Sequence, residues 1–125
     1  MSYIETKIDE EKDLTIQMVV GPVSLQDACD ELDRYYAGPF TKLILWDLTR
    51  AGISSYKTEH IIALVRKVKQ YHHLRKGGKT AMVISKDLNY GLTRMYQAHA
   101  EGEELDFEIR VFRDMEKAKE WLGVE

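Results

Sequence analysis

The feature that most constrains the fold is a repeated alternation, in which a strand-like apolar run is followed by a helix-like run four times. The runs at 43–48 and 81–84 are almost continuously apolar, which is typical of strands that are covered on both faces of a parallel sheet. The segment 107–111 alternates apolar and polar residues, as expected of a half-exposed strand near a sheet edge. The alternation therefore predicts an α/β protein with 43–48 and 81–84 as central strands.

The N-terminal region has a different pattern. Segments 3–8 and 14–20 each alternate apolar and polar residues and are joined by the polar stretch 9–13, which predicts a β-hairpin. With the helix-like runs, the predicted order is ββαβαβαβα in a single domain over residues 1–125. Right-handed crossovers make the sheet mostly parallel and leave the first strand antiparallel at its edge.

Local signals locate the helices. Ser24 followed by Asp27 predicts a capped helix start, and Asp114 predicts a second one. Apolar stripes at helical spacing are expected to face the sheet; they comprise Leu25, Ala28, Cys29 and Leu32, then Ile61, Leu64, Val65, Val68, Tyr71 and Leu74, then Leu92, Met95, Tyr96 and His99. The side chains expected to be almost fully buried in the central strands are Ile44, Trp46, Val83 and Ile84.

Composition narrows the class of protein. The chain has 125 residues, 44% of them hydrophobic and 31% charged, which is typical of a soluble globular domain. No segment approaches the roughly 20 apolar residues of a membrane span, and the N-terminus lacks a signal-peptide core, so we expect a cytoplasmic protein. Cys29 is the single cysteine, which excludes an internal disulfide, and its place on an apolar helix stripe predicts an unreactive thiol.

Charge is distributed unevenly along the chain. Residues 66–94 contain eight Lys or Arg and one acid, Asp87, although the net charge is −3. One interpretation is that these cations complement the C-terminal end of one long helix. The other is a patch for an acidic protein surface or anionic lipid headgroups, with peripheral contact to a membrane. The pI near 5.8 argues against a nucleic-acid partner.

Catalytic signatures are missing from the sequence. It contains no metal-ligand spacing, no nucleophile elbow and no phosphate-binding glycine loop. His72 and His73 are adjacent and point in different directions on a helix, so they cannot bind one ion without partners from elsewhere. We therefore predict no catalytic residue, metal or cofactor.

Polar residues gather where two predicted strands end. Because loops at the carboxyl ends of parallel strands share one edge of the sheet, a ligand site is predicted there. Its residues are Thr49, Ser54, Ser55, Asn89, Tyr90 and Arg94. The structural alternative is that the serines form a turn or helix cap, Gly91 permits close helix packing, and Arg94 pairs with Asp87 or another surface acid.

A family resemblance rests on two segments and on the element order. Tyr90–Gln97 and the ending from Val111 through Leu122 resemble the SpoIIAA-like group of bacterial proteins, over nearly the whole chain. The resemblance implies the fold of STAS domains, which act as anti-sigma-factor antagonists, and of the lipid-binding domain of Sec14-type transfer proteins.

The resemblance leaves three functions open. The first is a non-catalytic module for a small amphipathic or lipid-like ligand. The second is an antagonist-type domain that binds a protein partner and is regulated by phosphorylation of Ser54 or Ser55. In STAS antagonists that serine lies in Asp-Ser-Ser-Gly, whereas here Ile53 precedes and Tyr56 follows the pair. The third is an enzyme acting on a small acid through Arg94 and a tyrosine.

Overall fold

The computed structural model describes residues 2–124, apart from the side chain of Leu88. Within these residues the order is ββαβαβαβα, as predicted. The strands are β1 (Tyr3–Asp9), β2 (Leu14–Pro22), β3 (Leu43–Gly52), β4 (Lys79–Val83) and β5 (Glu108–Phe112). The helices are α1 (Leu25–Ala37), α2 (Thr58–Lys69), α3 (Asp87–Gly102), α4 (Met115–Leu122) and a short 3₁₀ helix, η1 (His72–Arg75).

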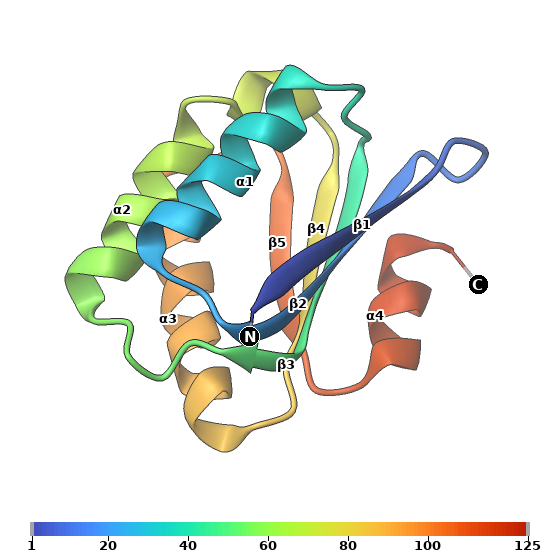
Figure 1. Ribbon diagram of the computed structural model, residues 1–125. Coiled ribbons are helices and arrows are strands. Elements are labelled where there is room, and N and C mark those ends of the chain that lie inside the picture. Colours follow the sequence, from blue (N-terminus) through green and yellow to red (C-terminus); the bar gives the residue numbers. More distant parts are fainter. Residues whose placement is uncertain (1, 125) are drawn as a thin grey trace.

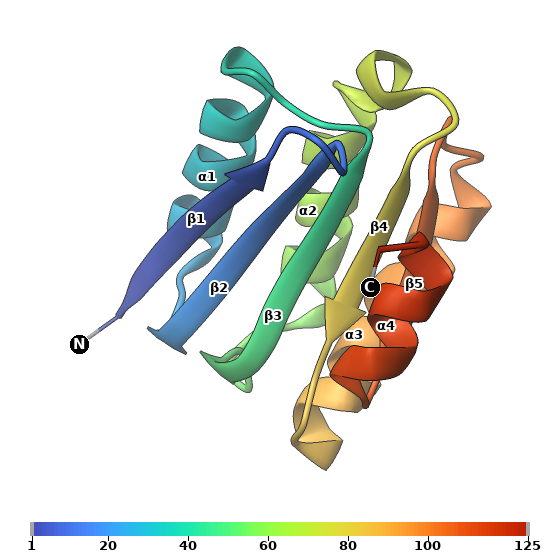
Figure 2. The ribbon, with the colours of Figure 1, turned by 90° about the vertical axis from the view of Figure 1, so that its right-hand side faces the viewer.

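The strands form one sheet in the order β1-β2-β3-β4-β5. β1 pairs antiparallel with β2, and each following pair is parallel, which confirms the predicted topology. Helices α1, α2 and α3 cover one face of the sheet and α4 covers the other (Figures 1 and 2). This layering follows from the strand order, because right-handed crossovers that advance in one direction place successive helices on the same face.

The central strands are buried on both faces. Ile44 belongs to the core cluster beneath the three helices, and Leu45 to the cluster beneath α4. Ile44, Val83 and Ile84 are at most 2% exposed, as expected. Trp46 differs from the prediction because it is only partly buried. Its ring lines a cavity between the sheet and the helices, so that one side of it lacks packed neighbours.

Both predicted N-caps are present. The Ser24 hydroxyl accepts a hydrogen bond from the Asp27 backbone N–H at 3.0 Å, and the Asp114 carboxylate accepts one from the Glu116 N–H at 2.8 Å. These bonds satisfy N–H groups that have no partner inside the helix. No helix within residues 2–124 is long and apolar enough to cross a membrane.

The second helix is shorter than predicted. It ends at Lys69, and the chain continues through a turn into η1. The tighter winding of a 3₁₀ helix shifts the faces of the residues that follow. Leu74 is therefore 47% exposed instead of facing the sheet, whereas Arg75 is 1% exposed instead of lying on a basic surface. On α3, His99 is likewise exposed, contrary to the predicted stripe.

Candidate functional site

Hydrogen bonds join the end of β3 to the loop after β4 and to the first turn of α3, at the carboxyl edge of the sheet. The Asn89 side-chain amide donates to the Ala51 carbonyl at 3.1 Å, and the Ser85 hydroxyl donates to the Thr49 carbonyl at 3.0 Å. Thr49 also donates its backbone N–H and its hydroxyl to Asp47 Oδ1. The Asn89 side chain thus links the first turn of α3 to the end of β3, whereas the Thr49 side chain is used within β3 itself.

Ser54 and Ser55 occupy the two central positions of a turn. The Tyr56 N–H donates to the Ile53 carbonyl at 3.0 Å and closes the turn, and both serines are exposed. The N-cap of α2 is Lys57, whose backbone N–H donates to Nδ1 of His60 at 2.9 Å. The serines are therefore turn residues, and they do not cap the helix.

Arg94 and Tyr90 lie on α3, and Arg94 is exposed. Of the partners considered for Arg94, Asp87 is not one, because Asp87 pairs with Arg113 at 2.8 Å. The Arg113 guanidinium also lies 5.0 Å from the centre of the Tyr90 ring, which is a cation–π contact. Close helix packing at Gly91 is also wrong, because a Cβ added there would meet nothing within 4 Å.

An apolar cavity, which the sequence did not reveal, lies between the sheet and helices α1, α2 and α3. Its volume is about 110 Å³. Its walls come from all three helices, from β1–β4 and from the loops that leave β2 and β3; they comprise Ile4, Val19, Val23, Ala28, Leu32, Trp46, Leu48, Ile53, Tyr56, Ile61, Leu64, Thr80, Met82, Leu92, Thr93 and Tyr96. Several of these side chains, Trp46 and Met82 among them, are only half-buried, so apolar surface is left uncovered.

Polar groups in the cavity walls are neutral or already bonded. The Thr93 hydroxyl donates to the carbonyls of Asn89 and Tyr90 at 3.0 Å, and Thr80 Oγ1 accepts from Arg75 at 2.8 Å. Burial raises the pKa of Tyr56 to about 12 and also raises the pKa of Tyr96. The walls therefore present neutral groups near pH 7, which suits apolar binding better than general acid–base catalysis.

None of the residues predicted for the ligand site lines the cavity, although several of them neighbour wall residues in the sequence. Ser54 and Ser55 lie between Ile53 and Tyr56, which both line it, and Arg94 directly follows another wall residue, Thr93. The sequence signal that could have pointed to the cavity is the pair of large apolar residues, Ile53 and Tyr56, on either side of the two serines in the loop after β3.

Several cations of the basic segment 66–94 are paired with acids or buried. Lys67 pairs with Asp33 on α1 at 3.2 Å, and Lys69 pairs with Glu103, just beyond α3, at 3.2 Å. Arg75 is buried. These contacts connect neighbouring elements and reduce the positive charge available to an anionic partner. Cys29, on α1, is half-buried, and burial raises the pKa of its thiol, while its low reactivity stays a prediction.

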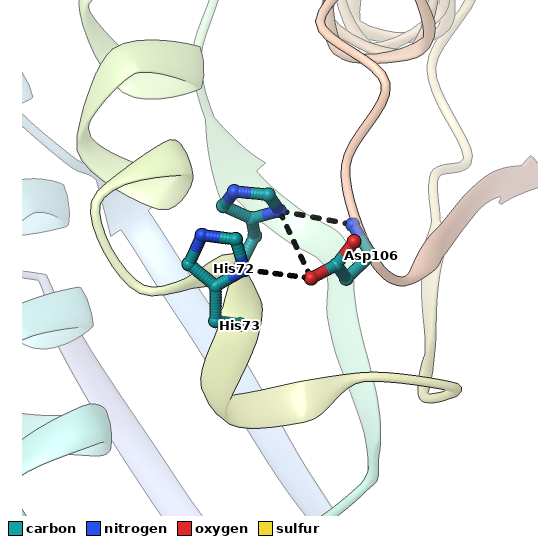
Figure 3. Close-up of side chains that lie close together, drawn as sticks. All are labelled: His72, His73 and Asp106. Atoms are coloured by element: carbon teal, nitrogen blue, oxygen red, sulfur yellow. Dashed lines mark hydrogen bonds and ion pairs between the residues drawn. The ribbon is translucent and has the colours of Figure 1, made fainter.

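Three possible metal ligands gather between η1 and the loop before β5. One possible ligand atom from each of His72, His73 and Asp106 lies within 4.8 Å of the other two (Figure 3). However, His72 Nδ1 accepts a hydrogen bond from the Asp106 backbone N–H at 3.0 Å, and His73 Nδ1 lies 2.7 Å from Asp106 Oδ2. The bond to His73 lowers the pKa of the Asp106 carboxyl. The cluster thus joins two segments that are distant in sequence, with the His72 lone pair already occupied.

We expect zinc to leave the melting temperature unchanged, because an ion would first have to displace the Asp106 N–H from His72. Differential scanning calorimetry with and without zinc, after removal of any affinity tag, is the measurement. A rise in melting temperature that disappears in His73→Ala would show instead that the cluster binds metal.

Comparisons with known proteins identify the fold. No protein-family model and no curated protein matches the chain. Among solved structures, the chain is similar to an uncharacterised protein of the DUF3478 family with a SpoIIAA-like fold from Shewanella loihica PV-4. The two are 20% identical, the match covers 98% of this chain and 95% of that chain, and the TM-score is 0.57. The SpoIIAA-like fold implied by the sequence resemblance is therefore confirmed.

Proposed function

We propose that this protein is a non-catalytic binding domain for a small apolar or amphipathic molecule, whose apolar part occupies the cavity beneath α1, α2 and α3. The observation that carries the proposal is the cavity itself, with its volume of about 110 Å³ and its almost wholly apolar walls. An apolar cavity of about 150 Å³ stays dry and binds benzene, so the space suits a small hydrocarbon group.

The neighbouring edge of the sheet supports an amphipathic ligand. Wall residues Ile53 and Thr93 are followed directly by exposed polar side chains, Ser54 and Arg94. A ligand whose chain occupies the cavity could place a carboxylate or phosphate among these groups, where a hydrogen bond to a charged partner is worth about 1.5–3 kcal/mol. The ligand class would therefore be a short-chain acid or a lipid-like anion.

Binding can be followed by the fluorescence of Trp46, which lines the cavity. The chain has 2 tryptophans, so Trp121→Phe leaves Trp46 as the single reporter. We expect hexanol and hexanoate to change the emission of this variant in a saturable way. Ala28→Leu should weaken both ligands by at least about tenfold, or 1.4 kcal/mol, because it fills part of the cavity.

The matched control is Ala98→Leu, which makes the same change at an exposed position on α3 and should leave binding unaltered. Arg94→Ala should weaken hexanoate and spare hexanol if the charged end lies at the edge of the sheet. Unsaturable emission changes, or equal binding by the Ala28→Leu and Ala98→Leu variants, would contradict binding in the cavity.

A second candidate function, an interaction domain regulated by phosphorylation, is favoured by the exposure of Ser54 and Ser55 in the turn before α2. Ile53 and Tyr56 depart from the antagonist pattern on either side, so we place it second. Native mass spectrometry of the freshly purified protein separates the candidates, because a retained apolar ligand and a covalent phosphate give different mass increments.

A further inference from the structure

β1 has an unpaired edge. It is the first strand in the sheet order, so that only one of its sides pairs with another strand, and no element between residues 2 and 124 pairs with the other side (Figure 2). It also carries two exposed large apolar side chains, Tyr3 at 48% and Ile8 at 47%. Proteins usually shield such an edge, because its free N–H and C=O groups can pair with another strand.

The sequence of β1 is complementary to itself when reversed about Thr6. We propose that two copies of this chain form a dimer by antiparallel pairing of their β1 strands, with Thr6 on the two-fold axis. Glu5 of each copy then lies opposite Lys7 of the other. On the other face of the joined sheet, Ile4 of each copy lies opposite Ile8 of the other.

Pairing in this register would cover an exposed apolar side chain of β1 and also its free backbone edge. Ile4 lies beside Val19 on the helix-covered face, and alternation places Thr6 and Ile8 on that face too. The second copy would therefore cover the exposed Ile8 with an apolar partner, while the free backbone groups of the edge would pair. The contact is isologous, as in most homodimers, and it closes at two copies because each β1 has one free edge.

The charged residues of β1 favour the register centred on Thr6 over the two registers centred on Glu5 or Lys7. Two-fold symmetry requires one residue to face its own copy. Centring the pair on Glu5 would oppose two carboxylates, and centring it on Lys7 would oppose two ammonium groups. Like charges directly opposite are destabilising, whereas the pair centred on Thr6 has opposite charges at both positions.

A charge swap tests the proposal in the full chain. Sedimentation velocity over a concentration series should show a dimer of the unaltered protein. Glu5→Lys and Lys7→Glu should each raise its dissociation constant by at least about tenfold, because symmetry counts every changed pair twice. The double variant E5K/K7E restores opposite charges and should dimerise within about threefold of the unaltered protein. Rescue by the double variant cannot arise from a folding defect in the single ones.

A cross-link tests the position of the axis. In a Cys29→Ser background, Thr6→Cys should form an intermolecular disulfide under mild oxidation, because opposite Cβ atoms in such pairs lie about 4.5–5.5 Å apart. Lys12→Cys, in the hairpin turn, is the exposed control and should not cross-link at a comparable rate. A monomer at every concentration, single variants that dimerise as the unaltered protein does, or a dimer that fails to cross-link at residue 6 would each overturn the proposal.

Discussion

Arg75→Ala is expected to lower the free energy of unfolding by about 3–5 kcal/mol, because it opens a cavity and leaves several buried acceptors without a donor. The Arg75 side chain is 1% exposed, and its partners within residues 2–124 are carbonyls and hydroxyls. Nε donates to the Thr41 carbonyl at 3.1 Å, and Nη2 donates to the Lys42 and Lys79 carbonyls at 2.8 Å each. Nη1 donates to the Thr80 hydroxyl at 2.8 Å.

The expected loss is large because one guanidinium connects the starts of β3 and β4 to η1. Its removal would leave buried carbonyls without donors and a cavity beside the Phe107 ring, whose centre lies 4.5 Å from the guanidinium carbon. A domain of this kind has about 5–15 kcal/mol of stability in total, so the expected loss is a large share of it.

Urea unfolding followed by circular dichroism measures the effect. Arg66→Ala, at an exposed position on α2, is the control and should change stability by no more than about 0.5 kcal/mol. Arg75→Lys should be intermediate, because an ammonium group keeps the charge but cannot donate in a planar fork. A loss below about 1 kcal/mol for Arg75→Ala would mean that water replaces the guanidinium.

The sequence was sufficient to predict the element order because each element has its own local signal. The nearly continuous apolar runs of β3 and β4 indicate strands covered on both faces, and both strands are central. The capping pattern at Ser24 and Asp27 places the start of α1 correctly. Such signals depend on residues close in sequence, and tertiary contacts did not override them.

Features that depend on contacts distant in sequence were not predictable. Arg75 lies in a basic run that suggested an exposed patch, yet its acceptors include the Lys42 carbonyl, 33 residues earlier. In the same way, His72 and His73 meet Asp106 only after folding. The turn that ends α2 at Lys69 changes which side chains face inward, and no glycine or proline in the sequence marks it.

In the candidate site, too, one part was predictable from the sequence and another part depends on tertiary packing. Topology alone placed the Ser54 turn and the start of α3 among the loops at the carboxyl ends of the strands, and the Asn89–Ala51 hydrogen bond joins the end of β3 to α3. The cavity beneath them depends on how three helices leave Trp46 incompletely packed. Packing of that kind is a property of side-chain volumes in three dimensions, which periodicity does not report.

Gly78→Ala is expected to destabilise the protein by about 3 kcal/mol, the upper part of the usual range for overpacking. A Cβ at this position would lie far inside van der Waals distance of the Lys42 carbonyl oxygen and 2.9 Å from the Arg75 carbonyl oxygen. Both are backbone atoms that cannot rotate away. The Gly78 N–H donates to the Arg75 carbonyl at 2.8 Å, and the Glu108 N–H donates to the Gly78 carbonyl at 3.1 Å, so the glycine cannot move either.

Gly77→Ala is the matched control, because the neighbouring glycine has a φ of +81° and no atom within 4 Å of an added Cβ. Its cost should come from the left-handed backbone alone, about 1–2 kcal/mol. Urea unfolding should therefore rank Gly78→Ala as the more damaging, and the reverse order would contradict the clash. Because the displaced Lys42 carbonyl also accepts from Arg75, the double variant R75A/G78A should lose less than the sum of its parts. Simple additivity would show that the glycine and the arginine act on separate parts of the fold.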